Sequence, residues 1–258
     1  MKKVLFFDID GTLLVPGEKK IREDIVKALK KIMNEGNDVF IATGRCYMQA
    51  KNLIDQIGTK NYVCSNGQEV CVNDKIIYQS FFCENDVDYL VDIFEKNDIN
   101  WSYETRNNLV IPETKKTEEV KELLEGYEFY DLEIDPNYKK HNIFQFWLTI
   151  TKEQEKILPL IEKNHQYYCW EDGLFEILPI NENKAKGIQK VIDFYKNPIE
   201  TYAFGDSVND LEMLKKVDYS IAMGNGRDDV KKIAKYVTTD AKDNGIINAL
   251  KYYGILHD

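Results

Sequence analysis

The sequence lacks any apolar run close to the ~20 residues that a membrane-spanning helix needs. Its first apolar stretch is interrupted by Asp8, which is typical of a buried strand and not of a signal sequence. The chain has three histidines and five cysteines, with no CxxC pair among the cysteines. These shortages argue against a zinc site and a disulfide framework. They predict a cytoplasmic protein with reduced thiols and no membrane partner.

An excess of positive charge is also missing. Lys and Arg total 34 against 44 for Asp and Glu, so the formal net charge is −10. Such an acidic chain repels the phosphates of nucleic acids and anionic lipids, and we expect neither as a partner. A small anionic substrate stays compatible with the composition, because a few local cations can dominate a cleft. The composition does not predict an oligomeric state.

What the chain does have is alternating strand and helix patterns near both ends. Short apolar runs predict strands that are buried on both faces, and apolar residues at helical spacing predict the helices between them. The expected strands are residues 4–7, 39–42, 201–204, 219–223 and 236–238, and the expected helices are residues 21–32, 48–57, 188–195, 211–217 and 246–253. Short connections between them predict a Rossmann-like parallel α/β sheet with helices on both faces.

The middle of the chain has a different pattern. Helical segments at 87–94, 120–124 and 157–161 alternate with pairs of strands, of which 143–148 is the strongest. Paired strands between helices predict an antiparallel α+β module. We therefore expect an α/β core formed by residues 1–80 and 181–258, with an inserted α+β domain over residues 81–180.

Acidic residues follow the expected core strands. Asp8 and Asp10 come after the first strand, and Asp206 and Asp210 come after the strand at 201–204. The carboxyl ends of parallel strands meet at the edge of the sheet where ligands bind. Clustered carboxylates repel one another, and a hard divalent cation relieves that repulsion. Oxygen ligands without paired His or Cys favour Mg²⁺.

Groups that could bind an anion accompany the acidic residues. Thr43 offers a hydroxyl, Lys184 offers an ammonium, and nearby glycines expose backbone N–H groups. Each feature alone has an ordinary explanation, since Asp often caps a helix, Thr43-Gly44 could be a simple turn, and lysine is usually solvated. Their conjunction at successive strand ends predicts a phosphate site that holds a metal.

These segments resemble the motifs of the haloacid dehalogenase-like (HAD) superfamily, and within it the Cof-type sugar-phosphate phosphatases. Residues 8–12 (DIDGT) resemble the first motif, residues 42–45 (ATGR) the second, and residues 205–210 (GDSVND) match the fourth. The third motif falls in a segment with two lysines; in similar Cof-type sequences the lysine precedes the glycine by three positions, so the resemblance favours Lys184 over the alternative, Lys186. The resemblance covers the whole core and implies that the inserted domain is a cap.

The resemblance implies Mg²⁺-dependent hydrolysis of a small phosphate monoester, a sugar phosphate or a related phosphometabolite. Asp8 would attack phosphorus to give an aspartyl-phosphate, and Asp10 would act as general acid and then general base. Thr43 and Lys184 would complete the catalytic set by donating to the phosphoryl oxygens. The implied substrate-binding residues are Gly44, Arg45 and Asn209, and the implied metal-binding residues are Asp8, Asp10 (through its carbonyl oxygen), Asp206 and Asp210.

Other interpretations stay open at this stage. The same aspartates could serve a phosphotransferase or phosphomutase that passes the phosphoryl group to a sugar and not to water. A non-enzymatic protein that binds a phosphometabolite is a further alternative, although it would not need all of these residues. Arg45 could bind substrate or form a salt bridge within the core. The sequence does not identify the phosphate ester.

Overall fold

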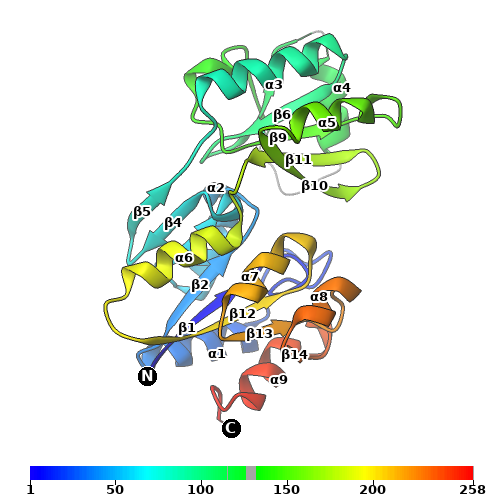
Figure 1. The fold of residues 1–258 in the computed structure, drawn as a ribbon. Coiled ribbons are helices and arrows are strands. Elements are labelled where there is room, and N and C mark those ends of the chain that lie inside the picture. The colour runs from blue at the N-terminus through cyan, green and yellow to red at the C-terminus, as the bar shows by residue number, and fades with distance from the viewer. Residues whose placement is uncertain (115, 126–131, 258) are drawn as a thin grey trace. The chain divides into compact units, whose positions relative to one another are not determined.

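The computed structural model describes residues 1–114, 116–125 and 132–257. The chain divides into two compact units (Figure 1). The first, named the core unit, comprises Met1–Arg45, Ala50–Gln79 and Asn183–Asp258, and the second, named the inserted unit, comprises Cys46–Gln49 and Ser80–Glu182. Within the described residues, no helix combines the length and the apolar character needed to cross a membrane.

An eight-stranded sheet forms the centre of the core unit. Its strand order is β14-β13-β12-β1-β2-β3-β4-β5. Neighbouring strands are parallel from β14 to β3, whereas β4 and β5 are antiparallel to the strands before them. The bounds of these strands are β1 Lys2–Phe7, β2 Asp38–Ala42, β3 Tyr62–Cys64, β4 Glu69–Val72, β5 Lys75–Gln79, β12 Ile199–Gly205, β13 Tyr219–Ala222 and β14 Tyr236–Val237.

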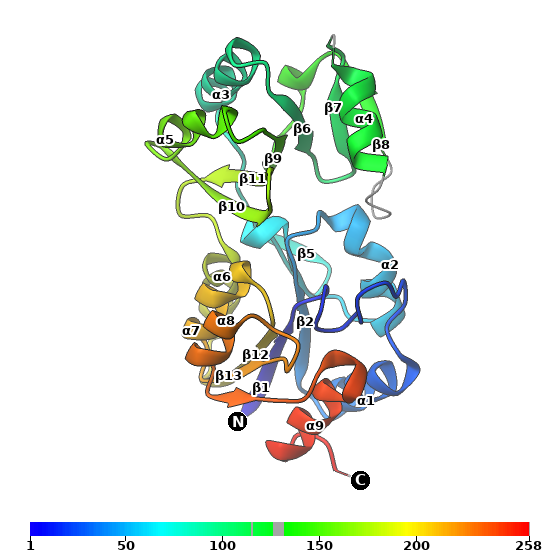
Figure 2. The same ribbon diagram turned by 90° about the vertical axis from the view of Figure 1, so that its right-hand side faces the viewer.

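Helices cover both faces of this sheet (Figure 2). Helix α7 contacts both α6 and α8 on one face, and α1 contacts α9 on the other. The bounds of the core helices are α1 Glu23–Asn34, α2 Tyr47–Ile57, α6 Lys184–Phe194, α7 Leu211–Lys216, α8 Asp228–Ile233 and α9 Gly245–Tyr252. The predicted α/β sheet with helices on both faces is confirmed. The sequence patterns did not predict α8 or the strands β3, β4 and β5.

Strand β1 is held within the sheet by apolar contacts on both of its faces. Residues Val4–Phe7 are fully buried. Alternate side chains of a strand point to opposite faces, so Phe6 packs against Phe40 with ring centroids 5.1 Å apart, while Phe7 stacks on Phe204 at 4.4 Å. Apolar contacts on both faces fix the strand in the sheet. The residue that follows it, Asp8, is thereby held at the carboxyl edge.

The inserted unit contains a six-stranded sheet with the order β10-β11-β9-β6-β7-β8. Its neighbouring strands are antiparallel, as the sequence predicted, except for the parallel pair β7 and β8. The exception follows from α4, which lies between β7 and β8 in the chain and returns it in the same direction. The bounds are β6 Asn100–Glu104, β7 Leu109–Pro112, β8 Leu132–Asp135, β9 Gln145–Thr149, β10 His165–Glu171, β11 Leu174–Pro179, α3 Glu84–Lys96, α4 Thr117–Glu125 and α5 Leu158–Ile161.

Aromatic side chains form much of the core of the inserted unit. Phe94, Trp101 and Phe146 pack with ring centroids 5.5 to 5.9 Å apart. Phe144 is also buried, whereas Trp147 is half-buried against a smaller apolar cluster. The apolar strand predicted at 143–148 is therefore part of a core, and it begins two residues later than expected.

Candidate active site

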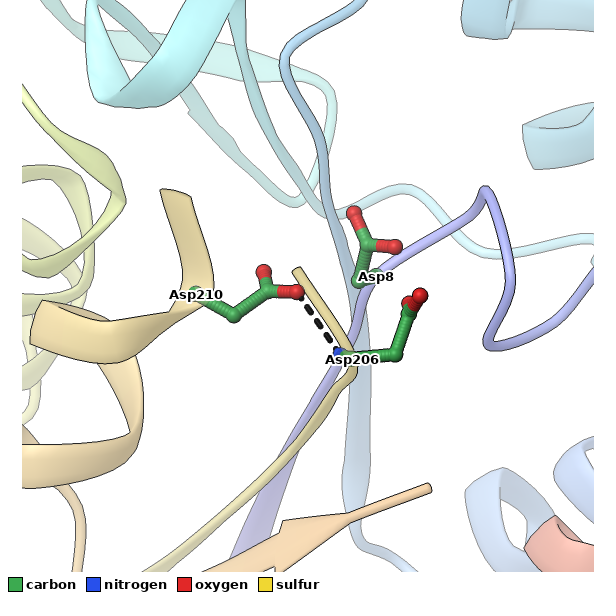
Figure 3. A group of neighbouring side chains, drawn as sticks. All are labelled: Asp8, Asp206 and Asp210. Atoms are coloured by element: carbon green, nitrogen blue, oxygen red, sulfur yellow. Dashed lines mark hydrogen bonds between the residues drawn. The ribbon is translucent and has the colours of Figure 1, made fainter. Parts of the chain in front are cut away.

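Three carboxylates meet at the carboxyl ends of β1 and β12 (Figure 3). Asp8, Asp206 and Asp210 each offer one oxygen within 4.8 Å of the others. The backbone explains why they adjoin, because Asp8 N donates to Phe204 O at 3.0 Å and extends the β1–β12 pairing by one residue. Asp8 and Asp210 are buried and Asp206 is half-buried.

The ammonium of Lys184 lies between two of these carboxylates. Its Nζ donates to Asp8 Oδ1 and to Asp210 Oδ1, both at 2.6 Å, and the side chain is fully buried. Lys184 is the first residue of α6, and the Asn183 side chain caps that helix by accepting from Lys186 N at 2.9 Å. The Nζ of Lys186 lies elsewhere, 5.7 Å from the ring centroid of Tyr78.

Burial and mutual repulsion perturb the charges of this cluster. Burial raises the pKa of Asp8 well above its usual value; Lys184 opposes this rise, and the neighbouring aspartates add to it. Burial, together with the charge of Asp210, raises the pKa of Asp206 to about 7. Burial alone would lower the pKa of Lys184, but the charges and hydrogen bonds of Asp210 and Asp8 raise it overall. The cluster therefore has more carboxylate charge than its lysine neutralises.

Asp210 is hydrogen bonded through both carboxylate oxygens. Its Oδ2 accepts from Asp206 N at 2.9 Å and from Ser207 N at 3.0 Å, while Oδ1 accepts from Lys184. Figure 3 shows the carboxylate beside the backbone nitrogen of Asp206. Asp210 therefore stabilises the turn after β12, and it holds both the backbone of Asp206 and the ammonium of Lys184 in place.

Two residues of the first motif hold Asp206 from the other side. The buried Thr12 donates from Oγ1 to Asp206 Oδ1 at 2.9 Å. Gly11 has φ +80°, and a Cβ there would lie 2.3 Å from Asp206 Oδ2, so both its backbone conformation and its contact require glycine.

Asn225 donates to Gly11 O at 2.8 Å and accepts from Ala241 N at 2.8 Å. Sequence reasoning assigned no role to Thr12 or Asn225. The glycines at 224 and 226, directly after β13, were the available signal for Asn225.

The carboxylate of Asp10 lies outside the three-aspartate cluster. Arg45 donates to it twice, from Nε to Oδ2 at 2.9 Å and from Nη2 to Oδ1 at 2.5 Å. The Asp10 side chain is 53% exposed and that of Arg45 only 11% exposed. The guanidinium of Arg45 thus forms a bidentate pair with the predicted acid–base residue.

The remaining predicted residues surround the turn after β2. Thr43 is buried, and its Oγ1 accepts from Arg45 N at 3.1 Å, which leaves the hydroxyl hydrogen to donate elsewhere. Asn209 donates from Nδ2 to Asn66 Oδ1 at 2.9 Å. Gly44 adjoins this amide pair, since a Cβ there would lie 3.3 Å from the Asn66 amide. Sequence reasoning did not identify Asn66.

The donor set fits a hard divalent cation. Asp8 and Asp206 supply oxygen ligands, the cluster contains neither His nor Cys, and both carboxylates have a raised pKa because they are buried near like charges. Mg²⁺ is typically held by one or two carboxylates together with a phosphate oxygen and water. The cluster can therefore hold such an ion beside a phosphoryl group.

Comparisons with known proteins agree with this geometry. A family profile described as haloacid dehalogenase-like hydrolase matches residues 5–250. The putative phosphatase YkrA of Bacillus subtilis is 32% identical over 98% of both chains. The 5-amino-6-(5-phospho-D-ribitylamino)uracil phosphatase YitU of the same species is 28% identical over 97% of both chains.

A solved structure resembles the chain along its whole length. The HAD subclass IIB sugar phosphatase BT4131 superposes with a TM-score of 0.83 at 28% identity. The match covers 99% of this chain and 100% of that one. The likeness therefore includes the inserted unit as well as the core unit.

Proposed function

Because this chain belongs to the haloacid dehalogenase-like hydrolases, we propose that it is a phosphatase that hydrolyses a small phosphate monoester with Mg²⁺ as cofactor. One observation carries the proposal: a fully buried ammonium lies 2.6 Å from two carboxylates, and a third carboxylate adjoins them at the edge of the sheet. This arrangement combines a nucleophile, a cation site and an anion donor within one cluster.

In the proposed first step, Asp8 attacks phosphorus. Lys184 occupies Asp8 Oδ1, so Oδ2 forms the new bond to phosphorus while the bond from phosphorus to the alcohol oxygen breaks. Asp10 gives its proton to the departing alcohol. For this, Asp10 must leave its pair with Arg45 and take up a proton, and the anionic substrate provides a competing partner for the guanidinium.

In the proposed second step, water hydrolyses the aspartyl-phosphate. Asp10, now ionised, accepts a proton from the water as its oxygen bonds to phosphorus. The bond between phosphorus and Asp8 Oδ2 breaks, which releases inorganic phosphate and restores the carboxylate. One side chain serves as acid and then as base, so each cycle returns the site to its starting protonation state.

The residues that would hold Mg²⁺ are the Asp8 and Asp206 carboxylates and the Asp10 carbonyl oxygen, with Asp210 in support. When bound, the ion would screen the repulsion between an anionic nucleophile and an anionic phosphate. Thr12 and Asp210 orient the Asp206 side chain and backbone for this task.

Three donors suit the equatorial phosphoryl oxygens, where charge is spread in the transition state. Lys184 uses two of its three ammonium hydrogens on Asp8 and Asp210 and has one left to donate. Thr43 contributes its hydroxyl, and Asn209 contributes its amide. Gly44 offers its backbone N–H nearby. Arg45 contacts the substrate once its guanidinium has left Asp10.

The relatives support a substrate in which phosphate esterifies a sugar or a sugar alcohol. The name of BT4131 describes a sugar phosphatase, and that of YitU describes a phosphatase of a phosphoribityl compound. We extend this class to the present chain, with residues 81–180 as the cap that contacts the sugar end and excludes water. The five free cysteines suit the reducing cytoplasm, where such phosphometabolites would be met.

The test is phosphate release from a panel of sugar and polyol phosphates, with Mg²⁺ and with EDTA. The Asp8→Asn variant should lose at least about 10³-fold in kcat, since it lacks the nucleophile, while its circular dichroism spectrum stays that of the wild type. Asp193→Asn, an exposed change on α6, is the matched control and should keep full activity. Substantial turnover by Asp8→Asn would remove Asp8 from the reaction.

A further inference from the structure

A short loop outside the predicted motifs contacts three segments that carry the proposed phosphate-binding groups. It is Ser65–Gly67, a short turn between β3 and β4. Its residues have positive φ in succession, at 47°, 49° and 94°. The left-handed conformation is unfavourable for Ser and tolerated by Asn at some cost. Such strain persists where surrounding contacts enforce it, often at functional sites.

The loop first supports the turn that carries Thr43. The backbone N of Asn66 donates to Thr43 O at 3.0 Å, and Ser65 N donates to Arg45 O at 2.9 Å. Thr43 N in turn donates to Val63 O at 2.8 Å, which extends the sheet pairing of β2 with β3. Backbone bonds at both ends therefore fix the turn from which the Thr43 hydroxyl extends.

The side chain of Asn66 next sets the orientation of Asn209. Its Oδ1 accepts from Asn209 Nδ2 at 2.9 Å, and both side chains are buried. Gly44 lies beside the pair: a Cβ there would be 3.3 Å from the Asn66 amide and 3.5 Å from Asn209 Nδ2. The two amides thus adjoin the residue of the turn that has no side chain.

The loop finally contacts the start of α6. A Cβ on Gly67 would lie 2.1 Å from Asn183 O, and a Cβ on Gly187 would lie 2.8 Å from Gly67 Cα. Only glycine at both positions allows this approach of loop and helix. The contact helps to fix the first turn of α6, from which Lys184 reaches the aspartates.

We propose that Asn66 is a positioning residue of the phosphate site, which acts through Asn209 and the Thr43 turn without touching the phosphate. The inference rests on the proposed function, because it assigns Asn66 to the same site. Removing the Asn66 side chain frees the Asn209 amide to turn away from the phosphoryl oxygens. The loss should appear in phosphate binding and turnover more than in folding.

The test compares two Asn→Gly variants. Asn66→Gly keeps a residue that accepts φ 49° but removes the amide. Asn73→Gly makes the same change at an exposed left-handed residue (φ 52°) between β4 and β5. With p-nitrophenyl phosphate and Mg²⁺, kcat/KM per folded molecule should fall about 10- to 100-fold in Asn66→Gly. Inorganic phosphate should inhibit it correspondingly less. Asn73→Gly should match the wild type in both.

A double-variant comparison tests the route through Asn209. If Asn66 acts by orienting Asn209, then Asn66→Gly combined with Asn209→Ala should lose no more kcat/KM than the larger single loss. Losses that multiply would show that the two residues act independently, and they would overturn the inference.

Two further outcomes are distinguishable. A wild-type protein that hydrolyses p-nitrophenyl phosphate or binds inorganic phosphate, with an Asn66→Gly variant equal to it per folded molecule, overturns the role of Asn66 alone. A wild-type protein that neither hydrolyses phosphate esters nor binds inorganic phosphate in calorimetry with Mg²⁺ overturns both this inference and the proposed function.

Discussion

At the scale of single residues, the cluster depends most on Lys184. Its ammonium lies between Asp8 and Asp210, and all three side chains are buried. Burying one charge of this group would be costly, but the three together satisfy one another through short hydrogen bonds. Removing the cation would leave two carboxylates facing each other without water.

We therefore expect Lys184→Met to lower the free energy of unfolding of the metal-free protein by about 3–5 kcal/mol, the usual cost of breaking a buried ion pair. It should also abolish turnover. Urea unfolding in EDTA measures the first effect.

Lys186→Met is the control for this change, because it alters a lysine two positions along the same helix. It should cost less than about 1 kcal/mol, the range of a surface cation–π contact with Tyr78. Equal losses in the two variants would contradict the assignment of Lys184 to the cluster.

Asp206 predicts a pH dependence of metal binding. In the metal-free protein its pKa is about 7, because burial and Asp210 disfavour the ionised form. A metal ion needs the ionised carboxylate, so binding must displace a proton below this pKa. Mg²⁺ affinity should therefore rise with pH by at least about tenfold per unit below pH 7, since the other proposed carboxylate ligand, Asp8, also has a raised pKa.

Calorimetric titrations with Mg²⁺ between pH 5.5 and 8.5 measure this dependence. The same titrations in two buffers of different ionisation enthalpy give the number of protons released. Asp206→Asn should bind Mg²⁺ weakly and release one proton fewer than the wild type. An affinity that stays constant from pH 5.5 to 8.5 would exclude Asp206 as the group that loses the proton.

At the scale of elements, the turns after β1 and β12 must approach each other closely. Gly11 allows this, because a Cβ there would lie 2.3 Å from Asp206 Oδ2. We expect Gly11→Ala to displace Asp206 and to weaken Mg²⁺ binding at least about tenfold, an effect comparable to loss of a group that supports a metal ligand. Isothermal titration checks this.

Gly17→Ala tests the cost of alanine at a positive φ without a contact like that between Gly11 and Asp206. Gly17 has φ +87°, close to the +80° of Gly11, but a Cβ there meets nothing within 4 Å. Its variant should lose about 1 kcal/mol of stability for the backbone conformation and keep Mg²⁺ affinity. If both variants bind Mg²⁺ equally, then the approach of Gly11 to Asp206 has no part in metal binding.

The elements that sequence predicted share a physical feature. Strands β1 and β12 are buried where they approach Asp8 and Asp206, so each shows a short apolar run, at residues 4–7 and 202–204. Strands β4 and β5 were missed, although the Asn73-Asp74 turn between them, with positive φ at both residues, is typical of a hairpin.

The same contrast holds within the candidate site. The motif residues carry recognisable chemistry, so the aspartates, Thr43 and Lys184 could be named from sequence. Asn66 acts through backbone strain and a bond to Asn209, which lies 143 positions away in the chain. A contact of that span is set by the folded sheet, and no local pattern encodes it.

At the scale of the whole molecule, the core unit and the inserted unit each have their own buried hydrophobic cluster, which predicts separate responses to metal. The proposed Mg²⁺ site involves residues of the core unit only. At a free Mg²⁺ concentration ten times its Kd, the folded core unit should gain about 1.4 kcal/mol. Hydrogen exchange should slow in β1 and β12, while β6 and β9 of the inserted unit keep their metal-free rates.

Asp206→Asn serves as the control for this exchange experiment. In that variant Mg²⁺ should leave the exchange rates of β1 and β12 unchanged, because the site lacks a ligand. Equal slowing in both units of the wild-type protein would contradict separate responses and would indicate that the units unfold together.

The pairing of β1 with β12 has a consequence for biosynthesis. Lys184 stands 176 positions after Asp8 in the chain, so the proposed nucleophile leaves the ribosome long before the cation that contacts it. The inserted unit is complete by Glu182 and can fold while β1 still waits for its neighbour. A nascent chain therefore carries Asp8 without its partners, and the proposed site can assemble only after Lys184 and Asp206 have both left the ribosome.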